Sequence, residues 1–407
     1  MTAVDLDRGL LARLSCGHAA ADLCQGAVPA LIPFFVIQRH WSYAAAGLLV
    51  LAMTVGSSII QPVFGAVAVR LEIRLLMPGG VLLAGIGISL AGVVSSYALT
   101  VFVVAISGLG VAAFHPEGAR YANHASGSRR GTGMSLFSVG GNVGFALGPI
   151  FVTPLVLVFG LSGTLALVVA PAIVSVVLFR SLPRMHAMAR TAVGRAARSA
   201  DQPEDDWNAF TRLGGVISLR SGVYFGLQSF VPLWFVHQLG STEAAGNTAL
   251  TAMLVAGAIG TLVGGRLVDR IGRRAVLVGS LAVQLPLLLA FVVSGSVLAG
   301  VLLAGVGFVT IMSFSVTVVM GQEYLPRRLG LASGVTLGAA IGVGGVAAVL
   351  LGVLADAAGL SAVMWTIALL PIPSLLLALT LPLTPQERVR DETATPSSRS
   401  APVPART

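Results

Sequence analysis

The chain has no lysine, so arginine supplies all 25 of its basic residues. Charge is scarce, because only 10% of the 407 residues are charged, and only two residues are cysteine. Since Cys16 and Cys24 both fall in the first apolar stretch, they provide neither a disulfide framework nor a zinc cluster. The sequence also lacks the G-x-S-x-G, H-E-x-x-H and Walker A motifs. We therefore expect no enzyme, no ATP-driven pump, and no bound metal or cofactor.

Hydrophobic residues, in contrast, make up 56% of the chain. They form about a dozen apolar stretches of roughly 20 residues, and each stretch is long enough to cross a bilayer. This pattern predicts an all-α polytopic membrane protein with about twelve transmembrane helices. The expected spans lie near residues 10–37, 43–69, 74–95, 98–122, 131–159, 162–181, 213–237, 244–268, 274–294, 297–321, 329–356 and 361–382.

Arginines lie mostly on one side of the predicted membrane. With the N-terminus inside, they fall in the N-terminal segment and the even-to-odd connections, whereas only Arg39 lies on the opposite face. Because positively charged loops stay in the cytoplasm, we expect an inner-membrane protein with both termini cytoplasmic. The net charge of +9 therefore implies no nucleic-acid partner. An acidic start without a cleavage site argues against a removable secretion signal.

One long polar interruption, residues 182–211, divides the chain. It predicts a first bundle of six helices over 1–181, a cytoplasmic linker over 182–211 and a second bundle over 212–383. The linker's basic part is either solvated or an amphipathic helix on the anionic leaflet. The tail over 384–407 is rich in Pro, Ser, Thr and Arg, which predicts disorder.

The two halves resemble each other in short segments at an offset of about 200 residues. The segment from Gln25 to Pro29 matches the segment from Gln228 to Pro232, since both have the form Q-x-x-V-P. The G-x-G at 108–110 matches that at 305–307, and arginine pairs occur at 129–130 and 327–328. Internal repeats of this kind are typical of transporters with a binding site between the halves.

The most specific motif is the loop Gly265-Arg-Leu-Val-Asp269-Arg270-Ile-Gly272-Arg273-Arg. It resembles the G-x-x-x-D-R-x-G-R-R pattern of the major facilitator superfamily. In that interpretation the glycines permit close helix approach and a tight turn, while Asp269 caps a helix and the arginines hold the cytoplasmic ends. The first half has Val69 at the position of the aspartate. We therefore expect one ionic gating contact rather than two; a plain basic loop is the alternative.

Three charged residues, Asp22, Glu117 and Arg220, interrupt stretches that are otherwise apolar. Charge inside a membrane costs several kcal/mol and is usually functional. The functional interpretation is ion-coupled transport, and the alternative is a structural ion pair between helices. We expect Glu117 or Asp22 to pair with Arg220 until a proton neutralises the carboxylate.

Other polar residues follow these charges at helical spacing. His18, Asp22 and Gln25 share one helix face, His115 and Pro116 precede Glu117, and Tyr224 lies one turn after Arg220. The histidines are either proton relays or hydrogen-bonding structural residues. Because His115 and Glu117 lack other ligands nearby in sequence, we expect no metal there. The expected proton-coupling residues are Asp22, Glu117, Arg220, His18 and His115, and the expected cavity residues are Gln25, Tyr224, Asn142 and Gln228.

The strings SCGHAAADLCQ, FHPEGARYA, SLFSVGGNVGFALGP and VISLRSGVYFGLQSFVPL resemble the fosmidomycin-resistance branch of the superfamily. The resemblance implies proton-coupled export of small drugs or anionic metabolites, powered by the proton gradient. The run from Gly144 to Gly148 and Pro149 is similar to part of the antiporter motif of drug exporters. With Pro116, these residues are expected to bend helices, although packing alone explains the glycines equally well.

Two other functions remain open at this stage. A proton-coupled symporter importing a small organic anion or nutrient would have the same fold and charge pattern. A transport-inactive scaffold or sensor would use the buried charges structurally. A membrane-embedded enzyme lacks a supporting motif. In each transport hypothesis the partners are a small-molecule substrate, protons and the lipid bilayer, and we expect a monomer.

Overall fold

Each half of the chain starts with a helix capped by an aspartate. The Asp7 side chain accepts the backbone N–H of Leu10 at 3.1 Å, and the Asp206 side chain accepts that of Ala209 at 2.9 Å. Such caps satisfy amide groups that have no partner inside the helix. The backbone amides of these aspartates bind carbonyls of Ala125 and Tyr324 in their respective halves. The first helix of each half therefore begins with the same capping arrangement.

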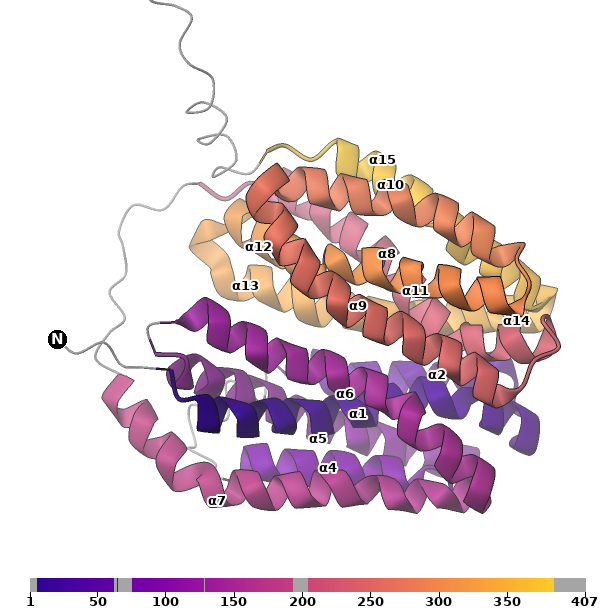
Figure 1. Ribbon diagram of the computed structural model, residues 1–407, viewed down its shortest axis with the longest axis horizontal. Helices are drawn as coiled ribbons and strands as arrows, with labels where there is room; N and C mark the ends of the chain where they lie inside the picture. Colours follow the sequence, from indigo (N-terminus) through magenta and orange to yellow (C-terminus); the bar gives the residue numbers. More distant parts are fainter. Residues whose placement is uncertain (1–5, 62–63, 65–74, 128, 193–203, 384–407) are drawn as a thin grey trace, which may run out of the picture.

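The computed structural model describes residues 6–61, 64, 75–127, 129–192 and 204–383, and this part contains helices and no strand. The first half, indigo to magenta in Figure 1, lies beside the second half, which runs from pink to yellow. The first half comprises α1 (Arg8–Arg39), α2 (Tyr43–Thr54), the π-helix η1 (Val55–Ile59), α4 (Leu76–Leu90), α5 (Tyr97–Ala125), α6 (Arg130–Phe159), the 3-10 helix η2 (Gly160–Val168) and α7 (Val169–Ala192). The second comprises α8 (Trp207–His237), α9 (Glu243–Ile271), α10 (Arg273–Val292), α11 (Ser296–Met312), α12 (Phe314–Tyr324), η3 (Pro326–Arg328), α13 (Leu329–Ser333), the π-helix η4 (Gly334–Ala339), α14 (Ala340–Leu369) and α15 (Pro371–Leu379).

Seven of the described helical runs are long and apolar enough to cross a membrane. Two of them, Thr132–Met188 and Leu331–Leu379, contain 57 and 49 residues. At about 1.5 Å per residue, each is more than twice as long as the roughly 30 Å hydrocarbon core. Gly160 and Gly359, with φ of 62° and 82°, interrupt these runs because glycine adopts positive φ freely. The all-α membrane fold is confirmed, whereas the number of twelve spans stays a prediction.

The segment between the halves is shorter than expected, because α7 continues to Ala192 and α8 begins at Trp207. Helix formation past residue 181 has a packing reason, since Leu182 and Met185 are buried in the core of the first half. Arg184 on the same stretch pairs with Asp7 at 2.6 Å. Residues 193–203 and the tail 384–407 lie outside the described part, as does most of the first-half loop around Val69.

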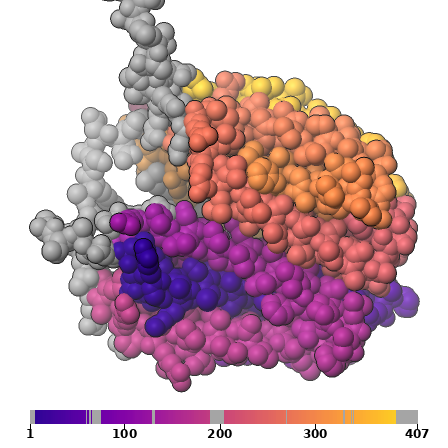
Figure 2. Space-filling view, in the orientation of Figure 1, coloured from indigo at the N-terminus to yellow at the C-terminus, as the bar shows by residue number. Residues whose placement is uncertain are grey.

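The halves meet along α2 with α14 and along α6 with α9. In the space-filling view the magenta helices of the first half lie directly against the salmon helices of the second (Figure 2). A Cβ added at Gly47 of α2 would overlap the Ala348 carbonyl, and one at Gly352 of α14 would overlap that of Tyr43. Backbones therefore approach closely at this boundary, as is common where small residues line membrane helices.

Gly148 has the same role within the first half, where α6 crosses α1. A Cβ there would overlap the backbone of Gly26 and Ala27. We expect Gly148→Ala to destabilise the protein by about 2 kcal/mol, because backbone atoms cannot move aside as a side chain can. The measurement is the apparent melting temperature in detergent. Gly79→Ala is the control, since a Cβ at Gly79 meets nothing within 4 Å; an equal change in both variants would contradict this packing role.

Candidate functional site

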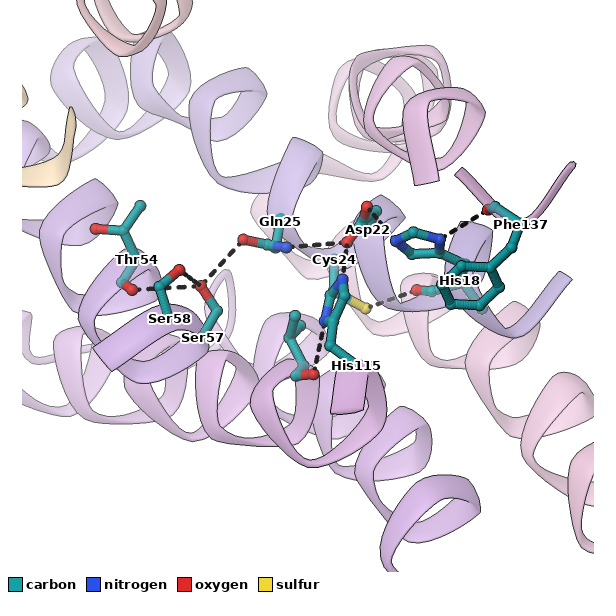
Figure 3. A network of polar contacts seen from close by, with 11 residues as sticks. His18, Asp22, Cys24, Gln25, Thr54, Ser57, Ser58, His115 and Phe137 are labelled. Carbon is teal, nitrogen blue, oxygen red and sulfur yellow. Dashed lines mark hydrogen bonds and ion pairs between the residues drawn. The ribbon is translucent and has the colours of Figure 1, made fainter. Parts of the chain in front are cut away.

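A buried carboxylate between two histidines forms the centre of the first half. Asp22 on α1 is 5% exposed, and its Oδ2 lies 3.3 Å from Nε2 of His18, one turn earlier. Its Oδ1 lies 3.4 Å from Nε2 of His115 on α5 and accepts the Gln25 side-chain N–H at 2.9 Å. Figure 3 shows both imidazoles turned toward Asp22. We call His18, Asp22 and His115 the imidazole–carboxylate cluster.

The other ring nitrogens determine how protons are arranged in this cluster. Nδ1 of His18 lies 2.8 Å from the Phe137 carbonyl, and Nδ1 of His115 lies 2.9 Å from the Val111 carbonyl. A carbonyl only accepts, so each Nδ1 carries a hydrogen and donates. A neutral ring then directs the Nε2 lone pair at the carboxylate. Both Nε2 atoms then face an oxygen of Asp22, so a proton or another cation held between them would stabilise the cluster.

Gln25 connects the cluster to a pocket between the two halves. Its Oε1 accepts the Ser57 hydroxyl at 3.1 Å while its Nε2 donates to Asp22, which fixes the orientation of the amide (Figure 3). Gln25 also lines the pocket, as does Gln228 at the matching position of the second half. The two repeat-related glutamines therefore face one space. The lining residues are Gln25, Val28, Pro29, Val50, Met53, Thr54, Phe145, Phe225 and Gln228.

Gln228 differs from Gln25 in having no partner. It is 1% exposed, and neither its amide nitrogen nor its amide oxygen has a hydrogen bond to a described residue. An unsatisfied buried amide costs about 1–3 kcal/mol. A side chain that lines a pocket and lacks partners is available to a ligand there.

Arg220 on α8 is a buried charge without an ion pair to a described residue. It is 3% exposed, its Nε has no hydrogen-bond partner, and no described carboxylate lies within ion-pair distance. Its guanidinium carbon lies 5.3 Å from the centre of the Phe314 ring, a cation–π contact that compensates only partly for lost hydration. Tyr224 follows one helical turn later and is half-buried. The expected pairing of Arg220 with Glu117 or Asp22 is therefore wrong in this structure.

Glu117 instead pairs with a neighbour on its own helix. Its Oε2 lies 2.6 Å from Arg120, whose side chain is 37% exposed. Three residues separate them, the spacing that brings side chains together on α5. The sequence prediction did not include this pairing. Asp22 likewise has the two imidazoles and Gln25 as partners, so neither acid needs Arg220.

The expected gating loop contributes contacts inside the second half. Gly272 makes the turn between α9 and α10 with a φ of 87°, whereas a Cβ at Gly265 would meet nothing within 4 Å. Close approach therefore does not explain Gly265. Arg273 pairs with Glu323 of α12 at 2.9 Å. Arg270 is exposed, and the Asp269 side chain lies outside the described part.

The residues expected to bend helices lie within continuous helices. Pro116 is inside α5, and Pro149 is inside α6. Gly144 and Gly148 pack α6 against α1, at Ala19 and Gly26 respectively. This contact supports the packing interpretation. Asn142, expected in the cavity, is half-buried on α6 and does not line the pocket described above.

Several polar contacts had no signal in the sequence. Ser57 belongs to a π-helical turn that no apolar pattern predicts, and Gly141 lies against both Asp22 Oδ2 and His18 Nε2. Asn247 of α9 donates to the Ala30 carbonyl at 3.1 Å, across the boundary between the halves. Asp356 of α14 accepts the backbone amides of Tyr43 and Ala44 at 2.8 and 2.9 Å, also across it.

Two relatives cover most of the chain. A protein of Escherichia coli (strain K12) named "Fosmidomycin resistance protein" is 30% identical over 372 residues, which is 90% of this chain and 91% of the relative. An "Uncharacterized MFS-type transporter YfnC" of Bacillus subtilis (strain 168) is 33% identical over 366 residues, which is 88% of this chain and 89% of the relative. The resemblance found in the sequence is therefore confirmed.

Solved structures share the fold at low sequence identity. A bacterial homologue of the human lysosomal transporter Spinster, in an inward-facing and occupied conformation, has a TM-score of 0.70 at 14% identity, covering 91% of this chain and 96% of that one. The nucleoside transporter NupG has a TM-score of 0.67 at 14% identity, covering 91% and 98%. The sequence pattern of the Major Facilitator Superfamily matches residues 14–335 and 213–406. The chain therefore belongs to the Major Facilitator Superfamily of membrane transporters, and it is not an enzyme.

Proposed function

We propose that this protein exports a small anionic or drug-like molecule, such as a phosphonate, in exchange for protons. The observation that carries the proposal is Arg220, a buried guanidinium without a carboxylate partner among the described residues. A buried charge without a partner costs several kcal/mol, which transient pairing with an anionic substrate would offset. The planar fork of arginine suits phosphonate, phosphate and carboxylate groups.

Proton exchange is assigned to the imidazole–carboxylate cluster. Its three ionisable groups direct electron pairs at one another, so they hold a proton together and release it to an imidazole or to water. No nucleotide site or cofactor is needed, because the proton gradient supplies the energy. Glu117 remains a second proton candidate, although its carboxylate is already paired with Arg120 at 2.6 Å.

Gln25 supports coupling between substrate and proton. Its amide both donates to Asp22 and lines the pocket between the halves. The amide has a second N–H, and a substrate that accepts it and turns the side chain toward the pocket would weaken the hydrogen bond from Gln25 to Asp22. Loss of that donor favours protonation of the carboxylate, because a hydrogen bond to the charged form stabilises it. Substrate and proton thereby affect each other's binding.

Alternating access requires contacts between the halves that can break. At the end of the bundle where α1 finishes and α2 begins, Asp356 binds two backbone amides of α2. These amides belong to a helix N-terminus, which favours a negative charge. We assign this end to the outer face, with both chain termini in the cytoplasm of an inner-membrane monomer, and Asp356 to its closed state.

Replacing Asp356 with alanine is expected to open that end more often. Loss of two charge-assisted hydrogen bonds should cost about 1.4–3 kcal/mol, or at least about tenfold in the ratio of closed to open protein. Spin labels at His40→Cys and Ser241→Cys, in a background lacking Cys16 and Cys24, report the distance between the halves. Glu243→Gln removes a carboxylate from the same end and should leave the distance distribution unchanged. An unchanged distribution for Asp356→Ala would contradict its gating role.

The direct test is coupled flux in liposomes. Purified protein is reconstituted with a pH-sensitive dye inside, and a gradient of fosmidomycin, as the phosphonate probe, is imposed. Export by antiport predicts proton movement opposite to the phosphonate, and an imposed pH gradient should drive the phosphonate uphill. Phosphonate movement without any proton signal would refute proton coupling.

The alternative is a symporter that imports a small organic anion, for which the same Arg220 site would serve. The two functions differ in sign, because a symporter moves protons and anion in the same direction. The name of the Escherichia coli relative favours export, since a membrane transporter that confers resistance would do so by moving the compound out of the cell. Proton and anion entering together in the flux assay would establish the alternative.

A further inference from the structure

We propose that His18, Asp22 and His115 form a binding site for one divalent transition-metal ion, such as Zn²⁺. The inference goes beyond the proposed function and does not depend on it, because the site would bind metal whether or not the protein exports anions. It also differs from the sequence-based expectation that no metal binds at His115. Packing of α5 against α1 places His115 next to two further ligand residues, His18 and Asp22.

The spacing of the three ligand atoms suits a small ion. Nε2 of His18 and Oδ2 of Asp22 are 3.3 Å apart, and Nε2 of His115 and Oδ1 of Asp22 are 3.4 Å apart. One ligand atom from each residue lies within 4.8 Å of the others. In tetrahedral zinc sites with bonds of about 2.0–2.1 Å, ligand atoms are roughly 3.3 Å apart. The two short distances involve different oxygens of Asp22, so binding through one of these oxygens also requires a ring to move from within 4.8 Å to about 3.3 Å.

The surroundings of both rings match those of metal-bound histidines. A metal-bound imidazole usually donates its other N–H to a carbonyl or carboxylate, which fixes the tautomer and the ring orientation. Both rings do so here, His18 to the Phe137 carbonyl at 2.8 Å and His115 to the Val111 carbonyl at 2.9 Å. Gln25 similarly orients Asp22. The lone pairs of both Nε2 atoms are thus directed at the carboxylate before any ion arrives.

Room beside the cluster depends on a glycine. A Cβ at Gly141 of α6 would lie 2.6 Å from Asp22 Oδ2 and 2.6 Å from His18 Nε2. No methyl group therefore obstructs the two ligand atoms on that side. The cluster offers three protein ligands, and a water molecule or an anion would complete a four-coordinate site.

Ligand chemistry selects the class of metal. Two imidazoles with one carboxylate suit Zn²⁺, Co²⁺, Ni²⁺ or Cu²⁺, whereas Mg²⁺ and Ca²⁺ prefer oxygen ligands. A bound metal needs neutral imidazoles and an ionised carboxylate, so it would displace the shared proton. If the cluster also carries protons for transport, Zn²⁺ would inhibit the exchange.

The test is Co²⁺ binding to purified full-length protein without an affinity tag. Ligand-field absorption and calorimetry should show one Co²⁺ per chain, displaced by Zn²⁺. His18→Gln, His115→Gln and Asp22→Asn should each weaken binding at least about 100-fold, because each removes a ligand. His237→Gln is the control, since that histidine is exposed at the far end of α8.

Gly141→Ala gives a second variant in which all three ligands remain. It should also weaken binding, because its methyl group would press on Asp22 Oδ2 and His18 Nε2. If a ligand variant fails to fold, X-ray absorption on wild type with Zn²⁺ decides, and two imidazoles in the coordination shell support the site. Absence of binding by folded wild-type protein, or equal binding by the three ligand variants, would overturn the proposal. Neither readout uses transport, so failure of the proposed function stays distinguishable.

Discussion

Replacing Arg220 with methionine is expected to abolish transport of an anionic substrate while leaving the protein folded. Losing a charge-assisted contact with a buried anion costs about 3 kcal/mol, or roughly 100-fold in affinity. Arg220→Lys keeps the charge but not the planar fork, so it should retain intermediate activity. Phosphonate flux in liposomes for wild type and the two variants is the measurement.

The stability of the same variants separates function from structure. A guanidinium that is 3% exposed and has no described ion-pair partner does not stabilise the fold as a paired charge would. Its replacement by an apolar side chain should therefore leave the melting temperature unchanged or raise it. Arg212→Met is the matched control on α8. Arg212 donates a hydrogen bond to the Thr380 carbonyl, and its replacement should not affect phosphonate flux. A lower melting temperature with normal flux in Arg220→Met would assign Arg220 a structural role.

Replacing Asp22 with asparagine is expected to uncouple transport from protons. The amide has nearly the same shape but cannot take up the proton that we propose Asp22 shares with His18 and His115. Uphill phosphonate transport driven by a pH gradient should fall to background. Exchange of labelled for unlabelled phosphonate should persist, because Arg220 and Gln228 belong to the other half.

The pH-dye and exchange assays, performed together, measure this separation. Glu243→Gln is the control, a carboxylate at the first turn of α9 that lies outside the cluster. Loss of both uphill transport and exchange in Asp22→Asn would indicate a role in substrate binding or folding. Coupling that survives in Asp22→Asn and disappears in Glu117→Gln would place the proton on Glu117.

Helical periodicity correctly predicted part of the candidate site. His18, Asp22 and Gln25 recur at one- and two-turn intervals, so a helix places them on one face whatever surrounds it. The match between Gln25 and Gln228 likewise anticipated that both would face one pocket, because repeats place equivalent residues similarly about the central axis. These were local or symmetry arguments, and they needed no knowledge of side-chain partners.

The sequence did not correctly predict which side chains pair between different helices. The sequence contains several acids that could pair with Arg220, and opposite charge alone does not choose among them. Glu117 has Arg120 at 2.6 Å on its own helix, while His115 reaches Asp22 only because α5 packs against α1. The contact of Asp356 with α2 joins residues more than 300 positions apart, a separation of 313 for Tyr43. Such contacts depend on helix rotation and depth, which hydropathy does not encode.

The amino-acid sequence alone was enough to predict a helical membrane protein with two related halves, because apolar stretch length and internal repeats can be recognised without knowing how the helices pack. Which buried charges have partners depends on how the helices pack. Packing of α1, α5 and α6 gathers two imidazoles around Asp22, while α8 holds Arg220 beside Phe314 without an acid among the described residues. The physical reason is that burial cost and partner geometry are properties of the assembled bundle, not of any one helix.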